Sequence, residues 1–155
     1  MTMRFKYIFL SLMLIILLGS MTAIAAEDDY ASLGDYTFDI PEGYQIADES
    51  DNMITFQSDE DHVVIVYALD SVSDLDMFKS LLENQGCKLV DDTSFESGSF
   101  NVDQSTYTFM DTQGYLYVCD DGKGTPVLVA LGIPDSEDLP QADDNAAYQV
   151  VSSLE

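Results

Sequence analysis

The longest uninterrupted apolar run outside the N-terminal segment is Val63–Leu69, and it predicts a strand at the centre of a sheet. Its middle is β-branched and aromatic, and it contains neither Gly nor Pro. A strand covered on one face would alternate apolar and polar residues, so a continuous run indicates burial on both faces. Val127–Ile133, closed by Pro134, has the same character and predicts a second strand of this kind.

Shorter segments alternate apolar and polar residues with a period of two, which predicts strands with one buried face. These segments are 35–40, 44–46 and 52–58, and further strands are predicted at 87–90 and 115–119, which do not alternate in this way. The acidic turn 58–61 joins one of them to the central run. We therefore expect these two strands to form a hairpin.

One part of this pattern changes phase. Phe100 and Val102 alternate, and so do Tyr107 and Phe109, but the first pair lies at even positions and the second at odd ones. Successive side chains of a strand point to opposite faces, so one regular strand would place the two pairs on different faces. We predict a bulge or a turn near 103–105 that restores the phase.

A first helix is predicted from about residue 74 to residue 85, because apolar residues recur there with helical spacing. Ser73 is its candidate N-cap, and Gly86 suits the position just after its end. This apolar stripe should cover one face of the sheet. It consists of Leu75, Phe78, Leu81 and Leu82.

A second helix is predicted over about 143–154, with Asp143 or Asp144 as its cap. Its stripe consists of Ala147, Val150, Val151 and Leu154. The order along the chain is thus strands, a helix, a run of antiparallel strands and a helix. We predict an α+β fold in which a single antiparallel sheet carries two helices packed on it.

Residues 1–26 have the pattern of a targeting segment. Arg4 and Lys6 precede an apolar stretch, and small residues follow it, so cleavage is predicted after Ala25 or Ala26. The same segment is long enough to serve as an uncleaved membrane anchor. Both alternatives place the rest of the chain outside the cytoplasm, secreted or anchored. Residues 27–34 are interpreted as an acidic linker and 35–155 as a single domain.

The stretch Tyr36-Thr37-Phe38-Asp39-Ile40-Pro41-Glu42-Gly43-Tyr44 resembles the start of secreted PsbP-like domains, which follow the pattern F-x-I/V-P-x-G-W/Y. The order of elements after it also resembles that family. The resemblance covers about residues 35–155 and implies a sandwich of helices on an antiparallel sheet. It implies a non-enzymatic binding or assembly role, and it carries over no functional residues.

The chain is strongly acidic. It has 155 residues, with 29 acidic residues against 5 basic ones and a formal net charge of −24. Removal of 1–26, which carries Arg4 and Lys6, would leave three lysines and a net charge of −26. Such a surface repels phosphate backbones and excludes nucleic acid as a partner. It suits a basic partner, or it serves solubility alone.

No catalytic constellation is recognisable. His62 is the only histidine, and it lies at a strand start beside an acidic turn. Acidic turns could hold Ca²⁺, because oxygen ligands suit this ion, although none has the spacing of a calcium loop. We predict no catalytic residue and no cofactor, with Ca²⁺ as a weak alternative. The candidate turns are Asp59-Glu60-Asp61, Asp70 with Asp74 and Asp76, and Asp120-Asp121.

Two pairs of side chains leave alternatives open. Tyr115 and Tyr117 share one strand face, either as a sugar- or peptide-binding platform or as core under a helix. Cys87 and Cys119 form an even pair in an exported chain and could make a disulfide. Four strand segments between them would bring both to one end of the sheet, but a simple meander would set them too far apart laterally.

The sequence therefore predicts an exported, highly acidic, non-catalytic module that binds a protein or a cell-envelope component. The alternatives are a Ca²⁺-stabilised structural domain of the envelope and an enzyme with a carboxylate-based site. Contact with a membrane is expected only through the N-terminal segment.

Overall fold

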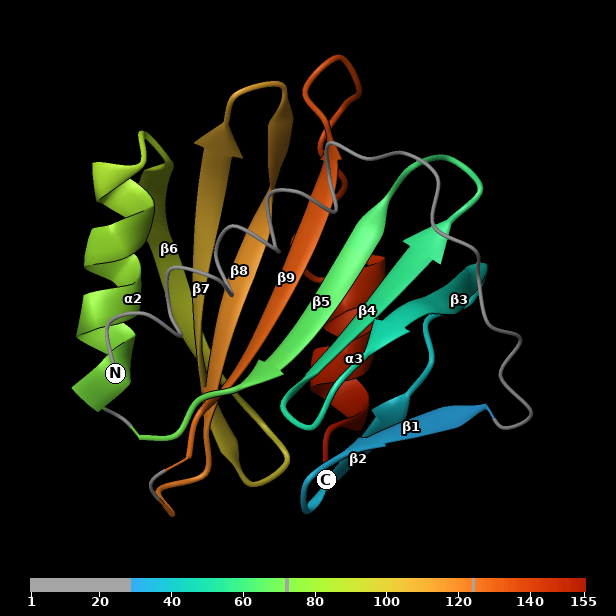
Figure 1. Cartoon of the computed structure of the whole chain (residues 1–155), viewed down its shortest axis with the longest axis vertical. Coiled ribbons are helices and arrows are strands. Elements are labelled where there is room, and N and C mark those ends of the chain that lie inside the picture. The colour runs from blue at the N-terminus through green and yellow to red at the C-terminus, as the bar shows by residue number, and fades with distance from the viewer. Residues whose placement is uncertain (1–28, 72, 124) are drawn as a thin grey trace.

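The computed structural model describes residues 29–71, 73–123 and 125–155. Its main sheet has seven strands in the order β3-β4-β5-β9-β8-β7-β6, and every neighbouring pair is antiparallel (Figure 1). A second sheet pairs two strands, β1 with β2. The strands are β1 (Tyr30–Leu33), β2 (Tyr36–Asp39), β3 (Tyr44–Glu49), β4 (Met53–Ser58), β5 (Val63–Ala68), β6 (Lys88–Ser97), β7 (Phe100–Phe109), β8 (Thr112–Asp120) and β9 (Val127–Pro134), and the described helices are α2 (Ser73–Asn84) and α3 (Ala146–Ser153).

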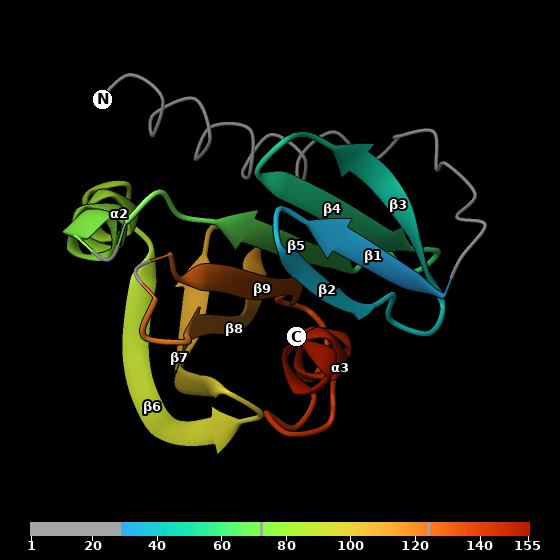
Figure 2. The ribbon, with the colours of Figure 1, turned by 90° about the horizontal axis from the view of Figure 1, so that it is seen from below.

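The predicted α+β class is wrong, because the molecule is mostly β and is not a single sheet with two helices packed on it. The sheet curls around α3, and α2 lies beside β6 at the sheet edge (Figures 1 and 2). Eight residues make α3 about 12 Å long, whereas seven strands are about 29 Å wide. One short helix cannot cover that width, so the β1–β2 hairpin packs beside it on the same face.

The central part of the sheet agrees with the sequence pattern. β5 and β9 pair with each other in the middle of the strand order, and residues Val63–Tyr67 are all buried. The predicted hairpin is confirmed, because β4 pairs antiparallel with β5 from Met53 opposite Tyr67 to Gln57 opposite Val63.

The predicted bulge near 103–105 is wrong. β7 pairs with β8 without interruption, so Phe100 and Val102 face one side of the sheet while Tyr107 and Phe109 face the other. The phase changes because different elements cover the two ends of the strand on opposite faces. The register shift in this region lies instead in the partner strand β6, between Asp91 and Thr93, opposite Ser105 and Gln104.

The end of α2 is as predicted. Gly86 has a positive φ of 93°, and the N–H of Cys87 donates to the carbonyl of Leu82 at 3.0 Å. This six-to-one hydrogen bond is typical of a glycine that terminates a helix. It turns the chain directly from the helix into β6.

The start of α3 differs from the prediction. Asn145, and neither Asp143 nor Asp144, is the N-cap, and its side chain accepts from the Tyr148 N–H at 3.0 Å. The predicted stripe is confirmed, since its four residues are all buried. The two aspartates are exposed, whereas Asn145 is buried. A buried cap position favours the neutral side chain, because burying a carboxylate is more costly.

Residues 30–33, within the expected linker, form β1 and pair with β2. Ala31 and Leu33 are buried under the sheet, so this part of the chain belongs to the core. The targeting segment and its cleavage positions, Ala25 and Ala26, lie outside the described residues. Among the described residues, no helix is long and apolar enough to cross a membrane.

Candidate binding pocket

The two faces of the main sheet carry separate apolar clusters. We call the side that contacts α3 and the hairpin the α3 face, and it includes Phe56, Val64, Tyr117 and Val129. The opposite side is the α2 face. Its cluster combines residues of α2 with sheet residues such as Ile65, Leu116 and Leu128.

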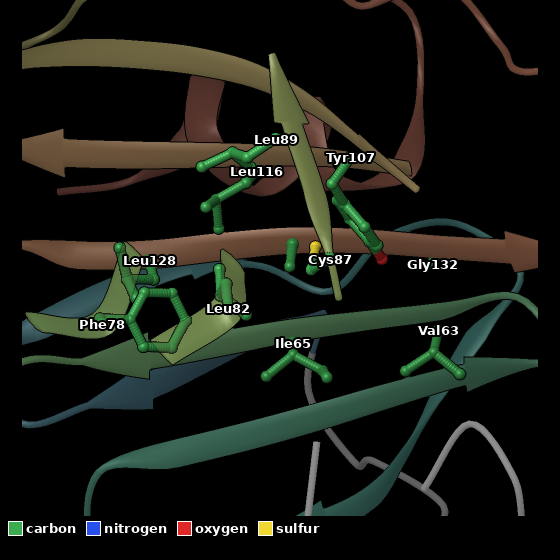
Figure 3. Close-up of a pocket in the computed structure, with 11 residues that line it drawn as sticks. Val63, Ile65, Phe78, Leu82, Cys87, Leu89, Tyr107, Leu116, Leu128 and Gly132 are labelled. Atoms are coloured by element: carbon green, nitrogen blue, oxygen red, sulfur yellow. The ribbon is translucent and has the colours of Figure 1, made fainter. Parts of the chain in front are cut away.

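An apolar pocket opens on the α2 face between the helix and the central strands (Figure 3). Its enclosed volume is about 40 Å³. The helix supplies one wall and β5 the other, while Leu116 of β8 and Leu128 of β9 form the buried floor. The lining residues are Val63, Ile65, Phe78, Leu82, Cys87, Leu89, Tyr107, Leu116, Leu128, Ala130 and Gly132.

The hollow follows from glycines at paired positions of neighbouring strands. Gly114 of β8 is opposite Gly132 of β9, and Tyr107 of β7 is opposite Gly114 on the other side. A Cβ atom at Gly114 would lie 1.6 Å from the carbonyl oxygen of Leu131 and 3.0 Å from a ring carbon of Tyr107. The tyrosine ring therefore needs a residue without a side chain beneath it. Its hydroxyl donates to the Leu131 carbonyl at 2.8 Å.

The two polar side chains of the lining carry no charge at neutral pH. Burial raises the pKa of Cys87 to about 11, and the nearby Glu83 carboxylate adds to this shift. Burial also raises the pKa of Tyr107 well above its ordinary value. Both groups stay protonated, so the pocket offers an apolar, uncharged surface.

The mouth and the margin of the pocket are less completely covered. Leu89, Tyr107 and Ala130 are half-buried. On the same face, Thr55 of β4 pairs with Ile65 of β5 and is 0% exposed. Its hydroxyl has no hydrogen-bond partner within the described part of the chain. An unpaired buried hydroxyl is unfavourable, so polar contacts on this face are incomplete.

His62 lies at the surface between two carboxylates. Its Nε2 is 2.6 Å from an Oε2 of Glu137, and its Nδ1 is 3.9 Å from Glu60. The contact with Glu137 connects the start of β5 to the segment after β9. This geometry is an ion pair when the imidazole is protonated.

Carboxylates in two of the three candidate acidic turns accept local hydrogen bonds. Asp120 accepts from the Gly122 N–H at 2.8 Å, and Asp121 accepts from the Lys123 N–H at 2.9 Å. Asp74 accepts from the Ser71 hydroxyl at 3.0 Å. Within the described ranges, no three His, Cys, Asp or Glu side chains converge so that they could hold a metal ion.

Tyr115 and Tyr117 belong to the core under α3, and the platform interpretation does not fit. Tyr117 is 0% exposed, and its hydroxyl donates to the Ala142 carbonyl at 2.5 Å. Tyr115 donates to the Pro140 carbonyl at 2.7 Å. Asn145 donates to the Tyr117 hydroxyl at 2.9 Å and so connects the cap of α3 to β8.

The structure does not bring Cys87 and Cys119 together, and it holds both as buried free thiols. Cys87 belongs to the α2 face and Cys119 to the α3 face. Between the two cysteines the chain runs through three strands, β6, β7 and β8, and not through the four predicted segments. One continuous β7 takes the place of two of those segments. Consequently they lie at opposite ends of the sheet, since Lys88 aligns through Thr108 with Gln113, about 20 Å along β8 from Cys119.

The pocket was not predicted from the sequence. In the sequence, Gln113-Gly114 predicts a turn, which is wrong because β8 runs through Gly114 from Thr112 to Asp120. Only the register of β8 against β9 shows that Gly114 is paired with Gly132. Glycine inside a strand pattern does indicate a close approach of another group. That signal was present, but it did not identify which group would approach.

No protein-family profile and no curated protein matches this chain. A crystal structure of a protein from Bacteroides thetaiotaomicron VPI-5482 is similar in fold, with a TM-score of 0.53 and 16% sequence identity. The alignment covers 84% of this chain and 48% of that one, so the chain spans about half the length of that protein. At this identity the likeness concerns the fold alone.

Proposed function

We propose that this protein is an exported, non-catalytic module that binds another protein through the pocket on the α2 face. The observation that supports this proposal most is the small, apolar character of the pocket. The expected location outside the cytoplasm rests on the N-terminal segment of the sequence.

The volume of the pocket favours a protein partner over a small-molecule ligand. Pockets for drug-sized ligands measure about 300–1,000 Å³, whereas this one encloses about 40 Å³. A space of this size accepts one apolar side chain of a partner. Buried apolar anchors of this kind dominate the energy of many protein interfaces.

The proposal is tested with photo-crosslinking amino acids at two adjacent positions of β6. Leu89 lies at the pocket mouth, while Val90 points to the opposite face and is 60% exposed. In the native host, a crosslinker at Leu89 should capture a defined partner, and the same group at Val90 should not. Equal capture at both positions, or none at Leu89, would contradict the proposal.

A pair of matched substitutions strengthens the test. Ala130→Leu adds bulk at the pocket mouth, whereas Ser80→Leu adds the same side chain on the exposed side of α2. Capture from Leu89 should fall at least tenfold in the first variant and stay unchanged in the second. Circular dichroism and thermal melting establish that both variants are folded.

A further inference from the structure

The main sheet is open, and both of its edge strands are irregular. β3 and β6 end the strand order (Figure 1), and in the described part of the chain no strand pairs with their outer sides. A bulge interrupts the pairing of β3 with β4 between Ile46 and Asp48, and another interrupts that of β6 with β7 between Asp91 and Thr93. The inner strand pairs continue without such a shift. The register shifts of this sheet therefore lie at its two edges.

Carboxylates are concentrated on the same two strands. They are Asp48 and Glu49 on β3 and Asp91, Asp92 and Glu96 on β6. The inner strands β4, β5 and β9 contain no charged residue. Because Lys88 is the only cation of β6, the net charge of that strand is −3 + 1 = −2. Two copies brought together along this edge would therefore repel each other.

The bulge of β6 is held in place by side chains of the neighbouring strand. Asp92 is the extra residue, and its Oδ2 accepts hydrogen bonds from the Gln104 amide at 3.1 Å and from the Thr106 hydroxyl. Asp91, the residue before it, accepts from the Ser105 hydroxyl at 2.9 Å. Both carboxylates belong to exposed residues, whereas Gln104 is buried. The bulge is thus a fixed part of the fold that presents acidic side chains at the edge.

An edge strand with unpaired N–H and C=O groups can pair with the same strand of a second molecule. β6 is ten residues long, and its Val90 is 60% exposed, so this edge also offers apolar surface. A bulge disrupts the regular ladder and bends the strand. We propose that the bulges and carboxylates of β3 and β6 keep the edges of the sheet from pairing with other copies, so that the protein stays monomeric. This role is independent of the pocket.

The test deletes Asp92 from the full-length chain. Asp91 is opposite Ser105 and Thr93 is opposite Gln104, and these two partners are consecutive in β7. The deletion therefore removes the bulge and leaves the residues on either side of it in the same register and on the same faces. Asp92→Asn is the matched control, because it keeps the extra residue and its amide oxygen can still accept both hydrogen bonds.

Sedimentation velocity measures the association state at about 0.15 M salt, where the screening length is about 8 Å and long-range repulsion is weak. The wild type and Asp92→Asn should stay monomeric. The deletion variant should form dimers or larger assemblies at a concentration at least tenfold below the highest at which the wild type is still monomeric. Hydrogen exchange should show that the amides of β6 become more protected as the concentration of this variant rises, while those of β3 do not.

A third variant separates charge from geometry. It combines Asp91→Asn, Asp92→Asn and Glu96→Gln, so it keeps the bulge and removes the carboxylates of this edge. We expect it to associate through β6 more strongly than the wild type and less strongly than the deletion variant. Circular dichroism and thermal melting establish that each variant is folded. If the deletion variant does not fold, this third variant decides, and its staying monomeric like the wild type would contradict the proposal.

Three other results would overturn the proposal. A folded deletion variant that stays monomeric would show that the bulge does not block pairing. Association without a rise in the protection of β6 would show that the molecules meet through another surface. A wild type that itself dimerises, with protection of β6 that grows with concentration, would show that the edge is an interface and is not blocked.

Discussion

The two faces of the main sheet bury apolar residues in different ways. On the α3 face, a helix and a hairpin complete the cover, and Asn145 connects the buried Tyr117 hydroxyl to the cap of that helix. On the α2 face, the helix lies at the edge, a pocket remains above Leu116 and Leu128, and the Thr55 hydroxyl has no partner among the described residues.

The difference separates stability from recognition. A face whose polar groups are paired and whose side chains fill the space has little capacity to accept another molecule. Atoms that line an apolar hollow lack van der Waals neighbours on one side, so a partner that fills the hollow can gain those contacts. The stability of the fold should therefore depend mainly on the α3 face, and the proposed binding would use the α2 face.

The largest expected effect compares the same truncation on the two faces. Phe56→Ala on the α3 face should lower the free energy of unfolding by about 4 kcal/mol, because Phe56 is 0% exposed and well enclosed. Phe78→Ala beside the pocket should cost about 2 kcal/mol, since its neighbours can relax into existing space. Urea denaturation measures both values. Equal losses would mean that the two faces are packed alike.

The second prediction concerns the polar network of the α3 face. Asn145→Ala removes both the helix cap and the donor to Tyr117, and it should cost about 2 kcal/mol in urea denaturation. In Asn145→Ser the serine hydroxyl can still cap the helix, but its side chain is too short to donate to the Tyr117 hydroxyl. This variant should therefore recover about half of the loss. A serine variant no more stable than the alanine variant would show that the cap contributes nothing.

The third prediction separates the two thiols by pH. Burial raises the pKa of Cys119 from 9.0 to about 12, so the folded state keeps a proton that the unfolded state loses above pH 9. The stabilisation that this thiol contributes is therefore fully present below pH 9. Between pH 9 and pH 12 that contribution falls by about 1.4 kcal/mol for each pH unit. The same loss from Cys87 should end near pH 11, because its pKa is raised to about 11.

Urea denaturation at pH 8, 9.5 and 11 tests this comparison. Cys119→Ala should be less stable than the wild type at pH 8, but its stability should decline less steeply with pH. Parallel declines in the wild type and the variant would show that this thiol ionises equally in both states.

The smallest expected effect concerns the α2 face. Thr55→Val replaces an unpaired buried hydroxyl with a methyl group of similar size and should raise the free energy of unfolding by about 1 kcal/mol. As a control, Thr108→Val on β7 changes an exposed residue and should stay within about 0.5 kcal/mol. A loss of stability in Thr55→Val would show that the hydroxyl is paired and the face complete.

The sequence predicted those features that depend on local pattern. The two apolar runs gave β5 and β9, the charged turn gave the β4–β5 hairpin, and Gly86 marked the end of α2. Each of these follows from residues close together in the chain. Their physical causes, burial on two faces and a positive φ, act over a few residues.

The features that depend on distant pairing were missed. The phase change within β7 came from elements that cover opposite faces, and periodicity alone cannot distinguish that from a bulge. The same error gave one strand too many between Cys87 and Cys119 and placed them at one end of the sheet. The pocket needed the pairing of Gly114 with Gly132, residues 18 positions apart.

The most direct test of the difference between the faces is the map of backbone amide shifts in NMR spectra when the partner captured at Leu89 is added. We predict that amides near the pocket mouth, at Leu89, Tyr107 and Ala130, shift in proportion to saturation. Amides at Tyr117 and Val150 on the α3 face should stay in place. Shifts spread evenly over acidic residues on both faces, or concentrated at α3, would contradict the account.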